Sequence, residues 1–241
     1  MPRPSRPIQR AVQVDISLDG GKGSADVTTG PAFFAASADA AIDPYFSSVV
    51  LLLHGEGADG SQTFTDHSSF GKTVTVSGGT AVSTTGPKYG TGSIKGVTNG
   101  YISAALGSEG TMTGDFTIEL WSKNTGNDVL FFNSGGNYLY NGIYQDYGGP
   151  ALSLPTYDNT LVWSHLAISR VGSTMRSFKN GALIDSQTYS GTVNLSTMIF
   201  GYYVPSNILY YQGYYDDIRV TKGVGRYTAG FTPPTAEFPN S

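Results

Sequence analysis

The chain has 241 residues and a formal net charge of -4; only 13% of the residues are charged, against a usual share of about 25%, and 32 are glycine. Lys and Arg are too few and too scattered to attract nucleic acid or an anionic membrane, so neither is expected as a partner. The absence of Cys excludes disulfides and thiolate metal sites, and no apolar run approaches the ~20 residues that cross a bilayer.

Residues 1–43 are predicted to form an extended N-terminal docking arm. Three prolines stand within the first seven residues, and proline favours an extended, polyproline-like chain because it fixes φ and lacks an N–H donor. A strand-like alternation of apolar and polar residues follows, and a lone strand must pair with a sheet edge. We expect the arm to join a neighbouring protein or, alternatively, to fold back onto its own domain. The candidate docking residues are Arg3, Arg6, Arg10, Val12, Val14 and Ile16.

Residues 44–241 are predicted to be all-β. Short β-patterned runs recur with Gly, Pro, Asn and Asp between them, which is typical of an antiparallel sandwich or barrel. Asn180 and Gly181 predict a hairpin with a type I′ turn. The predicted strands are Ser48–His54, Lys72–Val76, Phe116–Ser122, Val129–Phe132, Trp163–Val171, Met175–Lys179, Leu183–Tyr189, Met198–Tyr203 and Tyr214–Thr221.

Four stretches of this region resemble laminin-G-like domains. They are Asp43–His54 with Gly57–Ser61, then Gly114–Trp121, then Trp163–Arg170 with the turn Lys179–Gly181, and finally Gly213–Val224 with Arg226–Pro234. The resemblance implies an antiparallel β-sandwich of the concanavalin A-like, jelly-roll type over residues 44–241. The first and last stretches are similar to laminin-G-like domains of phage virion proteins. That similarity implies localisation in the virion, as a capsid decoration, tail or fibre module that contacts other virion proteins through its arm and is oligomeric in the assembly.

The acidic residues do not predict a catalytic pair. Glycoside hydrolases of the wider concanavalin A-like superfamily carry an E-x-D-x-x-E strand motif, and no three acids here have that spacing. The nearest pair, Asp115 and Glu119, shares one face of a predicted strand whose other face is apolar, so both are expected to face solvent. No G-x-S-x-G or H-E-x-x-H motif is present, and His165 is expected to pack or hydrogen-bond. We therefore expect no enzymatic activity.

No cofactor is required by the sequence, and the one candidate is a structural calcium ion. Many laminin-G-like sandwiches hold Ca²⁺ with carboxylate and carbonyl oxygens. The candidate ligands are Glu56, Asp59, Asp66 and Asp216. Asp216 is expected to share a face with the core residues Ile218 and Val220, where an unpaired carboxylate is costly. It is expected to meet either a cation or hydrogen-bond donors from the backbone or Arg.

Tyrosines gather in the final third of the chain. Adjacent tyrosines on a strand point to opposite faces, so part of this set must lie outside the core. Exposed tyrosine suits glycan contact, by stacking on a sugar, and protein interfaces; ordinary edge packing is the third interpretation. The candidate contact residues are Tyr202, Tyr203, Tyr210, Tyr211, Tyr214 and Tyr215.

Together with the resemblance to virion laminin-G-like domains, the sequence predicts a non-enzymatic phage virion structural protein. The alternative is a carbohydrate-binding adhesion module that recognises host-surface glycans.

Overall fold

The computed structural model describes residues 42–124, 129–133, 138–140, 143–145, 151–153, 161–202 and 212–241. These residues belong to one compact unit, Ala40–Ser241. The predicted docking residues Arg3, Arg6, Arg10, Val12, Val14 and Ile16 lie outside the described residues. Within the described part of the chain, no helix has the length and apolar character needed to span a membrane.

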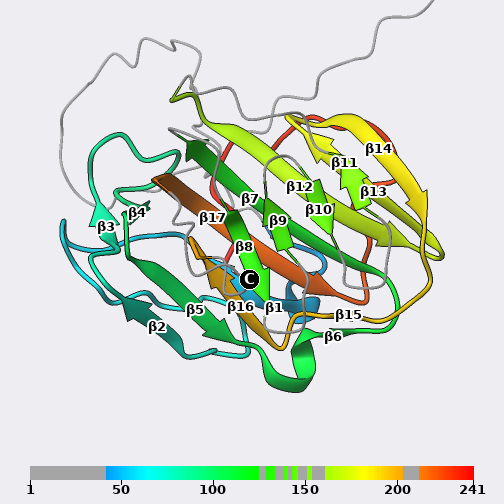
Figure 1. Ribbon diagram of the computed structural model, residues 1–241, viewed down its shortest axis with the longest axis horizontal. Coiled ribbons are helices and arrows are strands. Elements are labelled where there is room, and N and C mark those ends of the chain that lie inside the picture. The colour runs from blue at the N-terminus through cyan, green and yellow to red at the C-terminus, as the bar shows by residue number, and fades with distance from the viewer. Residues whose placement is uncertain are drawn as a thin grey trace, which may run out of the picture. The chain divides into compact units, whose positions relative to one another are not determined.

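Two antiparallel sheets contain most of the strands (Figure 1). The large sheet consists of β1 (Val49–Leu53), β3 (Ala81–Ser83), β4 (Ser93–Gly96), β7 (Phe116–Asn124), β12 (Ser164–Val171), β13 (Thr174–Lys179), β14 (Ala182–Thr188) and β17 (Gly213–Lys222). Its order is β14-β13-β12-β7-β17-β4-β3, and β1 also pairs with β17.

The small sheet consists of β2 (Val74–Ser77), β5 (Tyr101–Ala105), β8 (Val129–Asn133), β9 (Tyr138–Tyr140), β10 (Ile143–Gln145), β11 (Ala151–Ser153) and β16 (Thr197–Phe200). Its order is β11-β10-β9-β8-β16-β5-β2. A separate two-stranded ladder joins β6 (Thr111–Met112) to β15 (Val193–Asn194), and two short 3-10 turns, η1 (Phe46–Ser48) and η2 (Gly107–Gly110), complete the regular structure of the described residues.

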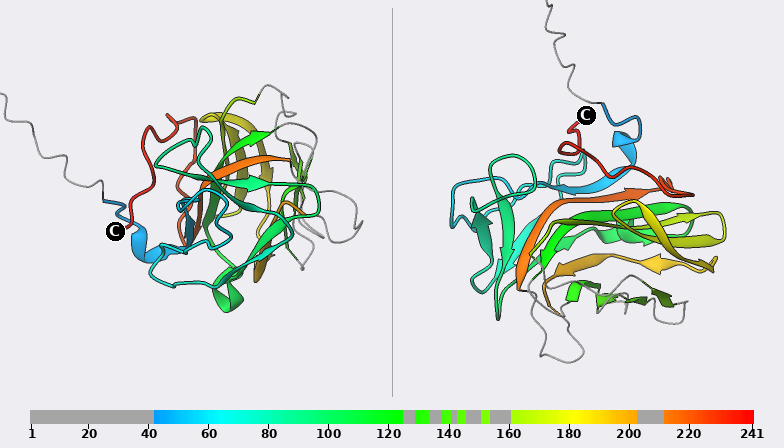
Figure 2. Two further views of the ribbon diagram at one scale, coloured as in Figure 1. Left: turned by 90° about the vertical axis from the view of Figure 1, so that its left-hand side faces the viewer. Right: turned by 90° about the horizontal axis from the view of Figure 1, so that it is seen from above.

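The main hydrophobic core lies between the two sheets, which form the layers seen in Figure 2. On β7, Phe116, Ile118 and Leu120 are buried in this core, as their alternation predicts, and Met198 and Phe200 of β16 belong to the same cluster. The predicted antiparallel β-sandwich is therefore confirmed. All the strands predicted from the sequence are present, with ends shifted by a few residues.

The outer face of the large sheet is covered as well, by a C-terminal tail formed by residues 223–241. In the right-hand view of Figure 2 the tail, in red, lies over β17, in orange, on the side away from the small sheet. The rings of Tyr227 and Phe231 in the tail are stacked with their centroids 3.6 Å apart. Phe231 also contacts Phe178 of β13, at 5.4 Å, and His165 of β12, at 5.7 Å. This second apolar layer buries side chains that would face solvent in a two-layer sandwich.

The strand β1 is buried on both sides because of this tail. Val49 and Leu52 form a small cluster with Phe238 of the tail, while the other three residues of β1 belong to the main core. This explains why the strand is a continuous apolar run without alternation. The backbone N–H of Asp43 donates to the carbonyl of Ser241 at 2.8 Å, so the segment before β1 and the end of the tail lie side by side.

The predicted hairpin between β13 and β14 is confirmed. Asn180 and Gly181 have φ values of 50° and 78°, the two positive values that a type I′ turn requires. The carbonyl of Gly181 accepts the backbone N–H of Phe231 at 2.9 Å, and a Cβ atom on this glycine would collide with the Phe231 carbonyl. The turn therefore serves as a docking point for the tail.

A β-bulge in β17 changes which side chains enter the core. Asp216 pairs with Trp121 and Arg219 with Glu119, so β17 has one extra residue between these pairs, and Asp217 has a φ of +48°. The expectation that Asp216 shares a face with Ile218 and Val220 is therefore wrong. The bulge leaves Ile218 and Val220 in the core and turns Asp216 to the outer face, where it contacts the loop before β4.

Candidate functional site

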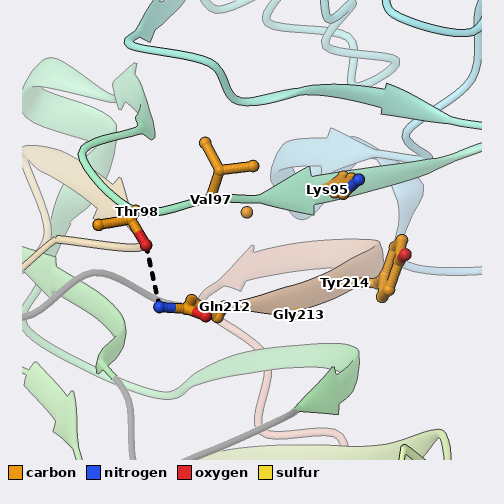
Figure 3. A pocket seen from close by; sticks show the side chains of 7 residues that line it. Lys95, Val97, Thr98, Gln212, Gly213 and Tyr214 are labelled. Carbon is orange, nitrogen blue, oxygen red and sulfur yellow. Dashed lines mark hydrogen bonds between the residues drawn. The ribbon is translucent and has the colours of Figure 1, made fainter.

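A groove of about 300 Å³ lies between the end of β4 and the start of β17 (Figure 3). Gly96 and Gly213 pair directly across the two strands, so no side chain fills the space there. Lys95 and Tyr214, the next pair in the register, border the groove on one side. Its lining residues are Lys95, Gly96, Val97, Thr98, Gln212, Gly213 and Tyr214.

The aromatic ring of Tyr214 is held between lysines. Tyr214 pairs with Lys95 on β4 and with Lys123 on β7, and the Nζ atom of Lys123 lies 4.5 Å from the centre of the tyrosine ring. Lys123 also lies over Trp163, at 5.2 Å, and both residues donate hydrogen bonds to the carbonyl of Gly86, at 3.2 and 3.3 Å. These contacts fix a row of two aromatic rings with an ammonium group between them.

Polar groups complete the other end of the groove. The Nε2 atom of Gln212 donates to the hydroxyl of Thr98 at 2.9 Å, as Figure 3 shows, and both Gln212 and Lys95 are exposed. The groove thus combines an aromatic ring with amide, hydroxyl and ammonium groups. Such a surface can stack on an apolar ring face while it hydrogen-bonds to hydroxyl or carboxylate oxygens.

The predicted contact tyrosines occupy different environments. Tyr214 lines the groove, and Tyr202 stacks on Tyr101 with their ring centroids 5.2 Å apart. Tyr215 is 1% exposed and belongs to the main core, where it contacts Phe200, so its assignment as a contact residue is wrong. The remaining predicted tyrosines, Tyr203, Tyr210 and Tyr211, lie outside the described residues.

The four predicted calcium ligands, Glu56, Asp59, Asp66 and Asp216, do not converge on one point. Glu56 accepts hydrogen bonds from the backbone and the hydroxyl of Thr91, and Asp59 accepts the backbone N–H of Thr84 at 2.9 Å. Glu56 and Asp59 therefore each hold a loop in place through these hydrogen bonds. Of the His, Asp and Glu side chains in the described residues, a different set comes close enough together to hold a metal ion.

Asp66 is buried and organises the loop after β1. Its two oxygens accept the backbone N–H groups of Leu52 at 2.8 Å, Ser68 at 2.9 Å and Lys72 at 2.6 Å, and the Ser68 hydroxyl at 2.8 Å. A carboxylate with four donors is stabilised without a cation. The role of Asp66 is therefore to hold the chain in place.

Asp216 also finds its partners in the backbone. It accepts N–H groups from Lys88 at 2.8 Å, Tyr89 at 3.2 Å and Asp217 at 2.9 Å. Burial raises the pKa of Asp216 to about 7, against the lowering effect of these hydrogen bonds. Of the two alternatives for Asp216, the structure shows the hydrogen-bonded one.

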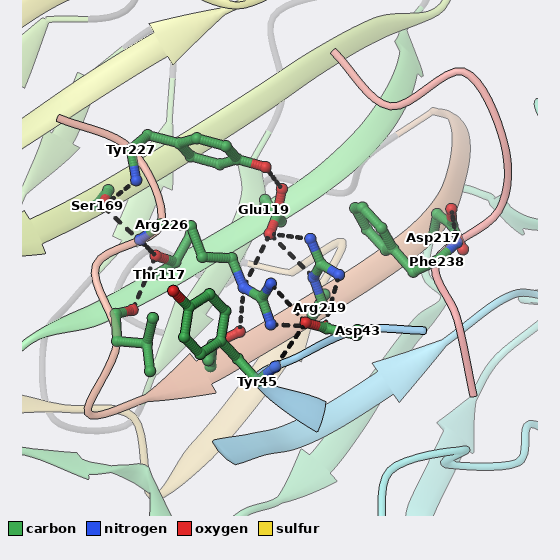
Figure 4. A network of polar contacts seen from close by, with 12 residues as sticks. Asp43, Tyr45, Thr117, Glu119, Ser169, Asp217, Arg219, Arg226, Tyr227 and Phe238 are labelled. Carbon is green, nitrogen blue, oxygen red and sulfur yellow. Dashed lines mark hydrogen bonds and ion pairs between the residues drawn. The ribbon is translucent and has the colours of Figure 1, made fainter. Parts of the chain in front are cut away.

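The expectation that Asp115 and Glu119 face solvent as a pair is wrong for Glu119. Asp115 caps a turn by accepting the backbone N–H of Gly172 at 2.7 Å. Glu119 is 0% exposed, because the tail covers its side of β7. It accepts two hydrogen bonds from Arg219 and one from the Tyr227 hydroxyl at 2.7 Å (Figure 4). The two carboxylates therefore have different partners, and Glu119 is the fully buried one.

The buried charges of this region form one network. Asp43 bridges Arg219 and Arg226 at 3.0 and 2.6 Å, and Arg219 in turn binds Glu119. Burial raises the pKa of Glu119, but the Arg219 charge, the His165 ring 3.3 Å away and the hydrogen bond from the Tyr227 hydroxyl outweigh it and lower the pKa to about 2. His165 packs edge-on against Trp121 at 5.2 Å, in agreement with its predicted packing role. The network connects the segment before β1, the large sheet and the tail, and its members Asp43 and Arg219 also line a surface hollow of about 310 Å³.

Comparisons with known proteins bear on the fold. Neither a scan against family models nor a search of curated proteins found a match. Among solved structures, the chain is similar to the binding domain of Paraclostridial mosquitocidal protein 1, with a TM-score of 0.56 and 15% identity over 78% of this chain and 50% of that one. It is also similar to the binding domain of botulinum neurotoxin DC in complex with SialylT, with a TM-score of 0.54 and 16% identity over 74% of this chain and 49% of that one.

A third similar structure is domain 4 of AbnA, a GH43 extracellular arabinanase from Geobacillus stearothermophilus, in complex with arabinotriose. Its TM-score is 0.50, with 18% identity over 74% of this chain and 94% of that one. The chain thus spans about half the length of the first two binding domains and nearly all of the arabinanase domain. At these identities the likeness establishes a shared fold, an antiparallel β-sandwich of the kind found in these domains.

Proposed function

We propose that the chain is a non-enzymatic carbohydrate-binding module that contacts its glycan at the groove between β4 and β17. The observation that carries this proposal is the ring of Tyr214, placed at the groove between Lys95 and Lys123 and close to the amide of Gln212. A sugar offers an apolar C–H face for the ring and hydroxyl groups for the amide and ammonium donors.

The similar folds support this choice of ligand. The neurotoxin DC domain was solved with SialylT and the arabinanase domain with arabinotriose. The lining of the groove includes no Asp or Glu, so a sugar bound there meets none of the carboxylates that glycoside hydrolysis requires among the described residues. Binding without turnover is the function that these side chains support.

A glycan array followed by calorimetric titration of the best ligand tests the proposal. Tyr214→Ala should weaken binding roughly tenfold or more, the equivalent of about 1.4 kcal/mol, and Gln212→Ala should weaken it as well. Tyr45→Ala is the matched control, because Tyr45 is 46% exposed and does not line the groove. Equal affinities for the wild type and the Tyr214→Ala variant, or no retained glycan, would refute the groove as the site.

A role in a phage particle is a second candidate, with the module held by its N-terminal arm and facing outward. It rests on the resemblance of the first and last matched stretches to virion laminin-G-like domains. These two stretches contain the paired strands β1 and β17, and the last one also supplies Arg226 to Asp43. A virion-incorporation assay with the full chain tests this candidate, and absence from purified particles would exclude it.

A further inference from the structure

Three side chains with metal-binding atoms converge beside the end of β1. His54 follows β1 directly, Asp217 lies in the bulge of β17, and Glu237 belongs to the tail. The Nδ1 atom of His54 is 2.6 Å from Oδ1 of Asp217 and 3.4 Å from Oε1 of Glu237. All three ligand atoms lie within 4.8 Å of one another.

The second nitrogen of His54 is oriented by the tail. Nε2 lies 2.8 Å from Oδ1 of Asn240, to which it donates its hydrogen. Histidines that bind metals usually donate their other N–H to a carbonyl or carboxylate in this way, which orients the ring. The arrangement leaves Nδ1 of His54 directed at the two carboxylates.

Two carboxylate oxygens and a ring nitrogen at this distance repel one another unless a proton or a cation lies between them. A proton on Nδ1 of His54 forms a hydrogen bond to Asp217. Oε1 of Glu237 then remains a buried oxygen without a hydrogen-bond partner in the part of the chain that the structure describes. Folded proteins rarely leave a buried oxygen without a partner, because the lost hydration is not replaced. A divalent cation at the centre of the three groups would bind all of them, Oε1 of Glu237 included.

The backbone is shaped to aim these groups. Asp217 has a φ of +48°, a conformation that a non-glycine residue adopts at some energetic cost. The bulge at this position turns its side chain away from the regular alternation of β17. The second oxygen of Asp217 accepts the backbone N–H of Phe238 at 2.9 Å, which holds the carboxylate in place as outer contacts of metal ligands commonly do.

Access to the three groups is from the tail side. His54 is 2% exposed and Asp217 0%, whereas the side chain of Glu237 is 36% exposed. Glu237 also lines a surface hollow of about 310 Å³ together with Phe238 and Pro239. An ion can therefore reach Glu237 first and then the two buried ligands.

We propose that His54, Asp217 and Glu237 form a metal site that takes Zn²⁺. One imidazole nitrogen and two carboxylate oxygens are ligands that zinc accepts, and water would fill a fourth, tetrahedral position. Zn–N and Zn–O bonds of about 2.0 to 2.2 Å place neighbouring ligand atoms about 3.3 Å apart, so shifts below about 1 Å suffice. Ca²⁺ prefers six to eight oxygens, which this set does not supply. None of the three residues lines the sugar groove, so this site is independent of the proposed function.

Titration of the full chain, freed of metal by a chelator, with ZnCl₂ tests the site. We expect one Zn²⁺ per chain by calorimetry and a higher melting temperature with Zn²⁺ than with EDTA, because the ion would join the end of β1, β17 and the tail. Glu237→Gln should weaken zinc binding at least about tenfold, with little change in the melting temperature in EDTA. Glu109→Gln, at a partly exposed acid of η2 paired with Lys222, is the control and should bind zinc like the wild type.

X-ray absorption of the zinc-loaded chain provides a second readout. It should show imidazole scattering and a first shell of nitrogen and oxygen at about 2.0 to 2.1 Å. The proposal is overturned if Zn²⁺ fails to bind, if Glu237→Gln binds it as tightly as the wild type, or if Ca²⁺ raises the melting temperature where Zn²⁺ does not.

Discussion

Arg219 of β17 lies directly opposite Glu119 of β7, and its Nε and Nη2 atoms both donate to the same oxygen of that carboxylate, at 3.0 and 2.8 Å. Both side chains are almost fully buried. Removing one partner of a buried ion pair leaves an uncompensated charge, which usually costs about 3 to 5 kcal/mol. The pair is therefore a sensitive point of the fold.

Arg219→Met should lower the free energy of unfolding by about 3 to 5 kcal/mol, measured by urea denaturation. Lys222→Met is the matched control, since its ion pair with Glu109 is about one-third exposed on both sides and should contribute about 0.2 to 1 kcal/mol. The double variant Glu119→Leu with Arg219→Met should recover part of the loss. A loss as large for Lys222→Met as for Arg219→Met would contradict this account.

Acid should destabilise the protein through Glu119 and Asp43. Burial raises the pKa of Asp43, but hydrogen bonds from Arg226 and Tyr45 and the Arg charges lower it overall, and the pKa of Glu119 falls from 4.5 to about 2. Their stabilising effect is complete above the pKa values of the unfolded chain and is lost as the pH falls toward about 2. Urea denaturation between pH 6 and 2 measures this loss of unfolding free energy. The pH values should bracket the carboxyl pKa of the unfolded chain, ~4, and that of folded Glu119, about 2. The curve for Glu119→Gln should be shallower over this range; an unchanged slope would exclude Glu119 as a source.

Two glycines with the same backbone conformation should differ in their tolerance of alanine. Gly60 has a φ of +80° and open space around it, whereas Gly181 has a φ of +78° and no room for a Cβ atom beside the carbonyl of Phe231. Gly60→Ala should cost about 1 to 2 kcal/mol, from the positive φ alone. Gly181→Ala should cost more, because the tail must also move. Equal losses in thermal or urea unfolding would show that the tail contact at Gly181 is unimportant.

The tyrosines Tyr210 and Tyr211 separate the two candidate functions. Double substitution by alanine should reduce glycan binding without changing assembly if they contact a sugar, and the reverse if they lie in a protein interface. A glycan titration and an assembly assay on the same preparation measure both. No change in either assay would leave edge packing as their role.

Deletion of residues 1–42 should yield a folded sandwich that no longer joins its assembly. The described contacts of the sandwich begin at Asp43, whose carboxylate and backbone remain after the deletion. Circular dichroism and size exclusion test the fold, and an incorporation assay tests docking. An insoluble or much less stable product would show instead that the arm completes the domain's own sheet, and retained incorporation would eliminate the docking role.

Much of the fold is predictable from the sequence because long, alternating strands carry their own signal. Phe116, Ile118 and Leu120 alternate over β7, and Asn180 with Gly181 fixes the turn of a hairpin. Strands of two to four residues, such as β3 and β15, are too short for a periodic pattern to predict them. The strand β3 forms only because it pairs with β4, and β15 only because it pairs with β6, which is distant in the sequence.

The errors in side-chain placement have two physical causes. Alternation predicts that Glu119 faces solvent, but it cannot show that a tail segment folds over that face and supplies Tyr227 as a partner. Likewise, one extra residue in β17 reverses the alternation, which turns Asp216 out of the core and directs Asp217 to His54. No spacing rule joins His54 to Asp217, since they are 163 residues apart and meet only because of the bulge.

The hydrogen bond between the N–H of Asp43 and the carbonyl of Ser241 places the two ends of the sandwich side by side. A host protein could therefore carry residues 43–241 as an insertion in one of its surface loops, without having to bridge a wide gap between the two junctions. Exposed loop tips tolerate such insertions well when the ends of the guest lie close together.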